Sequence, residues 1–261
     1  MKRFIRNLHK MTKELRIASY ILSKSRIIKT GSTTLTKIQP NNKCKALVLH
    51  GSSLGSNIGF KLNPVDLNNI FLTPFIFSVL IGILLGDGHI RVTSKNGNPQ
   101  IQFNQGFINL EYILYIFQIF NPLVTHLPSL IQRRDGSFYL LLYTRCLACL
   151  YPLYDIFIVD GVKRILSNIS QFLTPVSLAF WAMDVRSRTP EGFYLNTHSF
   201  SFEEQLILKK ALLDNFGILC NIHKHGAQFK LYIRAQSMTT FRTVVTPHFT
   251  PSMNYKLFKK I

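Results

Sequence analysis

One uncharged stretch decides how the chain is read: Leu80-Ile81-Gly82-Ile83-Leu84-Leu85-Gly86-Asp87-Gly88. Its apolar run predicts a buried helix that ends at Gly-Asp-Gly, and a strand-like segment follows at once. Gly82 and Gly86 are four residues apart, so they share one helix face, where a second helix can approach closely. The helix macrodipole disfavours a carboxylate at a helix C-terminus, so Asp87 needs a compensating partner, and a divalent cation is a candidate. The alternative is a core helix that ends at glycine beside an incidental acid.

Composition constrains the partners more than the fold. The chain has 261 residues, enough for one large domain or two small ones, and its 47% hydrophobic content excludes a disordered protein. Lys and Arg number 31 against 12 Asp and Glu, which gives a formal charge of +19. Such an imbalance favours nucleic acid as a partner first and an anionic membrane surface second.

The cysteines and the hydrophobic runs predict neither a disulfide framework nor a membrane span. Four cysteines do not make a disulfide framework, and a reducing compartment is expected. Cys146 and Cys149 could form a zinc site with the segment 220–225, but their apolar context predicts two cysteines packed in a helix. The uncharged run 70–86 is interrupted by Pro74, and the rest of the chain offers no second span, so a buried helix is predicted rather than a membrane helix.

The N-terminal region is strongly basic. Residues 1–44 contain eleven Lys and Arg and a single acid, Glu14, and Phe4–Leu22 has the periodicity of an amphipathic helix. Several interpretations stay open: a mitochondrial targeting segment, an interfacial membrane helix, a solvated tail, or an arm that lies on phosphate through Lys2, Arg3 and Arg6. Residues 45–68 are predicted to be a linker.

The order of predicted elements repeats once along the chain. The first set is helix, two strands, helix, two strands, helix, at 80–86, 90–94, 100–105, 110–120, 129–132, 137–144 and 146–158. The second set begins with another apolar helix that runs into an acid and comprises 178–184, 192–197, 201–216, 220–224, 228–234 and 238–245. A period near 100 residues indicates a duplicated domain rather than a solenoid.

The first predicted hairpin has one polar face. It turns at Asn96-Gly97, and in its second strand Gln100, Gln102 and Asn104 alternate with apolar residues. Asn and Gln read adenine edges, and a two-stranded ribbon fits a major groove, so these amides are candidate nucleic-acid contacts. The alternative is a half-exposed sheet with an ordinary polar face. The predicted surface also includes basic side chains of the hairpins of both halves: Arg91, Arg133, Arg134, Arg145, Lys224, Lys230 and Arg234.

Over about residues 70–258 the sequence resembles the LAGLIDADG homing endonucleases, in the single-chain, two-motif form of mitochondrial introns. Leu80–Gly88 is similar to the first motif, and the segments 173–184, 195–200 and 254–257 are similar to the second region. The resemblance implies an α+β fold of two pseudo-symmetric αββαββα halves packed through their motif helices. The expected domains are a basic extension at 1–68, a first half at 69–170 and a second half at 171–261, in a monomer.

The resemblance also implies the site. Asp87 matches the metal-binding acid of the first motif, and Lys163 and Lys256 match the basic residues that face the two metal sites, unless they are plain surface charges. The second motif departs from the pattern, since Val185 stands at the acid position. Asp184 comes one residue early, a rotation of about 100° on a helix. The second metal site is therefore predicted to be lost.

The hairpin of the second half that corresponds to the amide-bearing hairpin of the first half is predicted to be shortened as well. Seventeen residues separate Asp87 from Asn104, but only eleven separate Val185 from the corresponding Asn196. The second half therefore has little room for a first strand.

Two functions follow from these features. The first is a cleavage-deficient protein that binds structured RNA without a cofactor, either as a group I intron maturase or as a recruited component of the mitochondrial ribosome beside ribosomal proteins. It is expected in the mitochondrial matrix and away from the membrane. The alternative is a site-specific endonuclease or nickase that cuts double-stranded DNA with Asp87 and Mg²⁺.

Overall fold

The computed structural model describes residues 62–258, apart from 96, 185–188, 190 and 227. From Leu62 onward the chain forms one compact unit. The predicted helix Phe4–Leu22 and the basic residues Lys2, Arg3 and Arg6 lie outside the described residues.

The first half follows the predicted order of elements. Its helices and strands are α2 (Pro64–Asn68), α3 (Pro74–Leu85), β1 (His89–Val92), β2 (Pro99–Gly106), α4 (Leu110–Ile119), β3 (Ser129–Gln132), β4 (Phe138–Tyr143), α5 (Tyr151–Phe157), β5 (Ile158–Val159) and β6 (Val162–Lys163). The four longer strands form one antiparallel sheet in the order β1-β2-β4-β3.

The second half repeats this order with one strand fewer among its described residues. Its elements are α6 (Pro175–Asp184), β7 (Phe193–Leu195), α7 (Phe202–Phe216), β8 (Cys220–His225), β9 (Gln228–Ile233) and α8 (Met238–Val245). The sheet order is β7-β9-β8, which corresponds to β2-β4-β3 of the first half. The α+β fold of two related halves is thus confirmed, and in the described part of the second half no strand takes the place of β1.

Short 3-10 helices connect these elements. They are η1 (Phe107–Asn109), η2 (Asn121–Leu123), η3 (Ala148–Leu150), η4 (Ile169–Gln171), η5 (Ala235–Ser237), η6 (Thr246–His248) and η7 (Pro251–Lys256).

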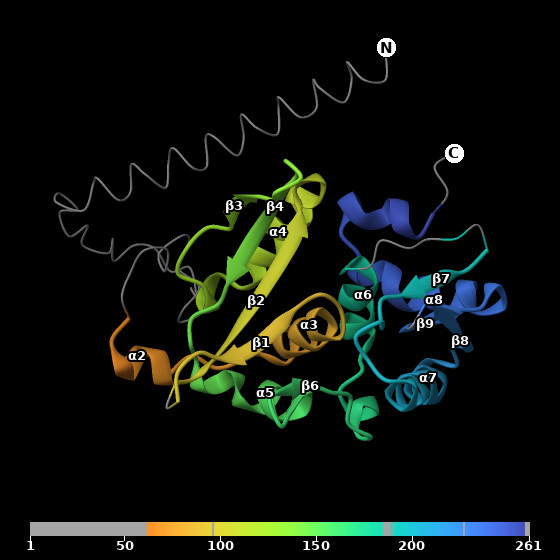
Figure 1. Ribbon diagram of the computed structural model, residues 1–261, viewed down its shortest axis with the longest axis horizontal. Coiled ribbons are helices and arrows are strands. Elements are labelled where there is room, and N and C mark those ends of the chain that lie inside the picture. Colours follow the sequence, from red (N-terminus) through yellow and green to blue (C-terminus); the bar gives the residue numbers. More distant parts are fainter. Residues whose placement is uncertain (1–61, 96, 185–188, 190, 227, 259–261) are drawn as a thin grey trace, which may run out of the picture. The chain divides into compact units, whose positions relative to one another are not determined.

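The two halves meet along α3 and α6, which lie side by side with one sheet on either side of them (Figure 1). Thr73 caps α3, with its hydroxyl accepting a hydrogen bond from the backbone N–H of Ile76. The segments 79–85 of α3 and 177–184 of α6 are buried throughout. A helix that is apolar on all sides fits this central position, where it is surrounded by protein.

At Gly82 the backbone of α3 lies directly against the backbone of α6. A Cβ atom added at Gly82 would lie 2.3 Å from the carbonyl oxygen of Ser177 and 2.8 Å from the Cβ of Phe180. The neighbouring rings fill the space around this contact, since Phe180 stacks on Tyr115 with centroids 6.2 Å apart. The predicted role of Gly82 as a helix-contact residue is therefore confirmed.

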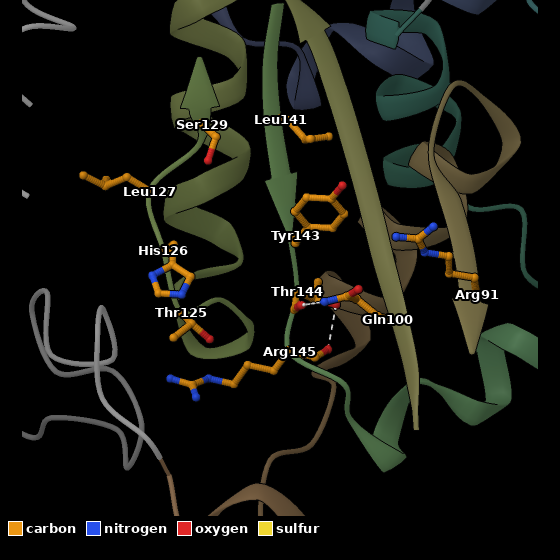
Figure 2. A pocket seen from close by; sticks show the side chains of 10 residues that line it. All are labelled: Arg91, Gln100, Thr125, His126, Leu127, Ser129, Leu141, Tyr143, Thr144 and Arg145. Atoms are coloured by element: carbon orange, nitrogen blue, oxygen red, sulfur yellow. Dashed lines mark hydrogen bonds between the residues drawn. The ribbon is translucent and has the colours of Figure 1, made fainter. Parts of the chain in front are cut away.

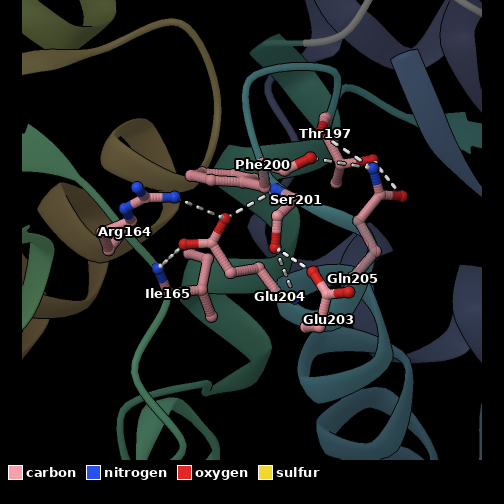
Figure 3. Close-up of polar contacts among 8 residues, drawn as sticks. All are labelled: Arg164, Ile165, Thr197, Phe200, Ser201, Glu203, Glu204 and Gln205. Carbon is pink, nitrogen blue, oxygen red and sulfur yellow. Dashed lines mark hydrogen bonds and ion pairs between the residues drawn. The ribbon is translucent and has the colours of Figure 1, made fainter. Parts of the chain in front are cut away.

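The buried carboxylate of Glu204 connects α7 of the second half with the segment that precedes α6. Glu204 forms the predicted capping box of α7 with Ser201, and its Oε1 accepts a hydrogen bond of 2.8 Å from the backbone N–H of Ile165. Arg164 lies 3.9 Å from the same carboxylate (Figure 3). Next to it, Gln205 is completely buried and donates to the carbonyl oxygen of Thr197.

Three local predictions are corrected by the structure. The predicted linker ends in the short helix α2, because Asn63 caps it and Pro64 stands at its first turn. The predicted helix 146–158 begins later, since the N–H of Leu147 is bonded to the carbonyl of Pro99 in the neighbouring strand. Cys146 is exposed in consequence, rather than packed in a helix. Within the described residues, no helix has both the length and the apolar character needed to cross a bilayer.

Substituting Gly82 tests the helix contact. Ala gains about 1 kcal/mol of helix propensity over Gly, but its Cβ would overlap the backbone carbonyl of the buried Ser177, so the packed backbone of α6 would have to shift. We expect Gly82→Ala to lower the free energy of unfolding by about 2 kcal/mol, measured by urea denaturation. Ser78→Ala, at a half-buried position of the same helix, is the control and should leave stability nearly unchanged. A Gly82→Ala protein as stable as the wild type would contradict the assignment.

Candidate functional site

The acids of the two motif helices come together, but they have different environments. Asp184 is 3% exposed, and its Oδ2 accepts a hydrogen bond of 2.5 Å from the backbone N–H of Asp87. Its Oδ1 accepts from the side-chain amide of Gln105, which in turn accepts from Asn109 at 2.8 Å. Both oxygens of Asp184 therefore bind donors of the first half, and this carboxylate fastens α6 to the end of α3.

Asp87 has an exposed carboxylate. Its Oδ1 accepts a hydrogen bond of 3.0 Å from the side-chain amide of Asn196, which follows β7. The side-chain oxygen of Asn196 lies 2.6 Å from Nδ1 of His198. This chain of polar side chains from the second half orients Asp87 and leaves part of its carboxylate in contact with solvent.

The two lysines take equivalent places at the ends of the motif helices. Lys163 donates from Nζ to the carbonyl oxygens of Gly86 at 3.2 Å and Gly88 at 2.9 Å. Lys256 is buried and donates to the carbonyl oxygen of Met183. A cation at a helix C-terminus offsets the macrodipole, so the compensation that the Asp87 region requires comes at least in part from protein side chains.

The interpretation of Lys256 as a surface charge is wrong, because the side chain is 3% exposed. Lys163 is half-buried, with its ammonium group 5.6 Å from the ring centroid of Phe200.

Burial shifts the pKa values of this cluster. Burial, followed by the nearby charge of Asp87, raises the pKa of Asp184 to about 8, although the Asp87 N–H, Lys256 and Lys163 act in the opposite direction. Burial lowers the pKa of Lys163 to about 8, against the attraction of Asp184 and Asp87. The pKa of His89 is also lowered, by burial and by the positive charges of Lys163 and Arg91.

The donor atoms of the site suit one divalent cation better than two. The described residues contain no group of three or more His, Cys, Asp and Glu side chains that could hold a metal. The zinc site considered for Cys146 and Cys149 is therefore not formed among these residues. Mg²⁺ is commonly held by one or two carboxylates together with water and substrate phosphate, and the exposed carboxylate of Asp87 meets that need. Asp184 has both oxygens engaged, and Val185 lies outside the described residues.

Three comparisons with known proteins decide the family. The model of the LAGLIDADG DNA endonuclease family matches residues 77–241, more than half of the chain. The chain belongs to this family.

Relatives and a solved structure agree with the match. The cytochrome b mRNA maturase bI2 of Saccharomyces cerevisiae is 27% identical over 213 residues, covering 75% of this chain and 50% of the relative. An intron-encoded endonuclease ai4 of Dictyostelium discoideum is 33% identical over 108 residues, 40% of this chain and 68% of the relative. The structure of the homing endonuclease I-WcaI bound to its DNA recognition sequence has a TM-score of 0.70 and 26% identity, covering 77% of this chain and 97% of that one.

The outer face of the first sheet of this LAGLIDADG protein carries the predicted amides. Gln100, Gln102 and Asn104 are half-buried, and their neighbours Ile101 and Phe103 point into the core. Gln100 donates to the carbonyl oxygen of Thr144 at 2.8 Å and lines a cleft of about 420 Å³ (Figure 2).

The predicted basic residues of the first half lie around this sheet. Arg91 and Arg145 line opposite sides of the cleft in Figure 2, and His126 lies between β3 and Arg145. Arg134 is exposed, and the guanidinium of Arg133 lies 4.8 Å from the ring centroid of Tyr139.

In the second half the predicted basic residues lie on or beside β8 and β9. Lys224 and Arg234 are exposed and Lys230 is half-buried. The Nε atom of Arg234 donates to the side-chain oxygen of Asn221 at 2.8 Å.

Sequence reasoning missed Gln105 and Asn109. The sequence contained a signal for Gln105, because it follows Ile101 and Phe103 at alternate positions and so shares their inward-facing side of β2. Its side chain is only 5% exposed. A polar side chain on the apolar phase of a strand needs a buried partner, and that partner is Asp184.

Asp184 should make stability depend on pH. Its folded pKa is raised to about 8, so between the unfolded value near 4 and pH 8 the folded state binds more protons than the unfolded state. Stability should therefore fall as pH rises through this window, by at most about 1.4 kcal/mol per pH unit. Asp184→Asn should flatten the profile measured by urea denaturation, because Asn keeps the shape and an acceptor oxygen. Asp155→Asn, at an exposed position, is the control, and an unaltered slope in Asp184→Asn would refute the assignment.

Proposed function

We propose that this LAGLIDADG protein binds structured RNA as a maturase of a group I intron and no longer cuts both strands of DNA. One observation supports the proposal most strongly. Asp184 has both carboxylate oxygens bonded to the first half, and the motif places Val185 where the second acid is expected. The helix pair therefore keeps its architecture with one accessible acid, Asp87, instead of two.

Charge supports the same proposal. Binding to phosphate needs positive side chains and does not need a second metal-binding acid. The formal charge of +19 provides them, and several basic side chains lie on or beside the strands of both sheets, such as Arg91 on β1 and Lys230 on β9. Relatives that are named as maturases make intron RNA the substrate that we propose first, with a mitochondrial location. Because two halves are present in one chain, the protein is proposed to act as a monomer.

Recruitment to a mitochondrial ribosome is a narrower version of this proposal. Its support is the basic segment 1–44, which lies outside the described residues.

The second candidate function is a DNA nickase, and the exposure of Asp87 favours it. Asp87 would hold one Mg²⁺ together with a phosphate oxygen, and the bound ion would stabilise charge on the phosphate and lower the pKa of a bound water. Asn196 orients the Asp87 carboxylate through its 3.0 Å hydrogen bond. Lys163, with its pKa lowered to about 8 by burial, holds the backbone carbonyls on either side of Asp87.

RNA binding is tested by direct competition. Purified full-length protein should bind a folded group I intron RNA at least about tenfold more tightly than a duplex DNA of equal length at the same salt concentration. Asp87→Asn should leave the RNA affinity unchanged, because the carboxylate is not a phosphate-binding group. Equal or tighter binding to the DNA duplex would favour the nuclease function instead.

Cleavage is tested on supercoiled plasmid that carries candidate target sites, with Mg²⁺ or Mn²⁺. The single accessible acid predicts nicked circles at most, and no linear product. Any nicking should disappear in Asp87→Asn and persist in Asp155→Asn, which removes an exposed carboxylate elsewhere. Linear DNA formed by the wild-type protein would show that two strand-cutting sites survive.

A further inference from the structure

The outer face of the second sheet carries a cluster of three rings, which we call the aromatic cluster: Tyr194 on β7, His223 on β8 and Tyr232 on β9. Side chains alternate between the two faces of a strand. In these strands Phe193, Leu231 and Ile233 point inward and are completely buried, and Phe193 packs on Phe241 of α8 with centroids 5.1 Å apart. The three rings belong to the opposite face, where each is half-buried and so keeps some contact with solvent.

The three rings are in mutual contact. His223 and Tyr232 are stacked with centroids 4.9 Å apart and an interplanar angle of 19°. Tyr194 is the cross-strand neighbour of Tyr232, with centroids 4.9 Å apart, and its hydroxyl lies 2.9 Å from Nδ1 of His223. Each ring is thus held in place by the other two, so little rotamer freedom is left to lose when a ligand binds.

The glycine before β7 leaves room for the ring of Tyr232. A Cβ atom added at Gly192 would lie 2.4 Å from both Cζ and the hydroxyl oxygen of Tyr232, so the tip of this tyrosine rests against a position where only glycine fits. The ring therefore leans along the start of β7 instead of standing free in solvent.

Positive charge lies beside the cluster. Lys230 is the cross-strand partner of His223. Arg234 follows β9, and its Nε donates to the side-chain oxygen of Asn221, the cross-strand partner of Tyr232. Aromatic rings beside lysine and arginine are the combination that binds single-stranded nucleic acid, in which the bases stack on rings while the phosphates meet cations.

The first sheet offers a different surface. Its outer face presents the amides of Gln100, Gln102 and Asn104, which suit the edges of paired bases. The tyrosines of its strand β4, Tyr139 and Tyr143, are four residues apart, and the guanidinium of Arg133 lies over the ring of Tyr139. The two halves therefore differ in chemistry as well as in strand number.

We propose that the aromatic cluster is a stacking site for unpaired bases of RNA, such as those of a loop or a bulge. The proposal rests on the proposed function in that RNA is the ligand, and it assigns single-stranded segments to the second half. Base-on-ring contacts tolerate any sequence, so the site would recognise an unpaired conformation rather than a particular base.

Stacking is measured with an unstructured RNA of about 12 nucleotides that contains 2-aminopurine, whose fluorescence is quenched on stacking. Binding of wild-type protein should quench the probe. Replacing Tyr194 and His223 together by Leu should weaken binding by roughly 5- to 100-fold and remove the quenching. Tyr151→Leu, which removes an exposed ring of α5 outside both sheets, is the control and should leave both unchanged. Thermal unfolding of each variant shows whether it is folded.

Photocrosslinking of the wild-type protein avoids variants altogether. The same RNA with 5-iodouridine in place of 2-aminopurine should crosslink to Tyr194, His223 or Tyr232, as mapped by mass spectrometry. RNA that binds but crosslinks only to first-half residues would overturn the stacking site and leave the proposed function standing. Absence of binding to both this RNA and a folded intron RNA would overturn both. Equal binding of the oligonucleotide and its duplex would also contradict a site for unpaired bases.

Discussion

The close approach of α3 and α6 is the contact on which the rest of the structure depends. It requires glycine at position 82, because any side chain there would meet the backbone of α6. One turn further on, the carboxylate of Asp184 replaces side-chain packing with hydrogen bonds to the Asp87 backbone and to Gln105. The junction of the two halves is therefore specified by shape at one end and by a buried polar group at the other, where an unpaired partner would be costly.

Side chains at this junction stabilise the fold independently of any role in metal binding or cleavage. The position of Asp184 explains how its motif helix serves the fold apart from any role in metal binding, because the carboxylate holds the two halves together. The lysines at the ends of both helices also contribute to the fold, since Lys163 and Lys256 donate to main-chain carbonyls there. In the described part of the second half no strand takes the place of β1, and the core is continuous nonetheless.

The sequence predicted the architecture well, because the apolar helices, the Asn-Gly turn and the capping box of Ser201 and Glu204 are local signals. It could not predict the role of Asp184, which depends on a contact with Gln105 that is 79 residues away in the chain. The late start of α5 was also missed, since a long-range bond from Leu147 to the neighbouring strand overrides local helix propensity. The aromatic cluster was hidden for a similar reason, because its three rings come from three strands.

The most direct test of the central claim is the rate of splicing of a group I intron RNA that the protein binds, measured at a Mg²⁺ concentration where the RNA alone splices slowly. The account predicts that wild-type protein and Asp87→Asn accelerate splicing equally, because binding depends on the two sheets and their positive charge rather than on the remaining acid. No acceleration by either protein, or acceleration that is lost in Asp87→Asn, would contradict it.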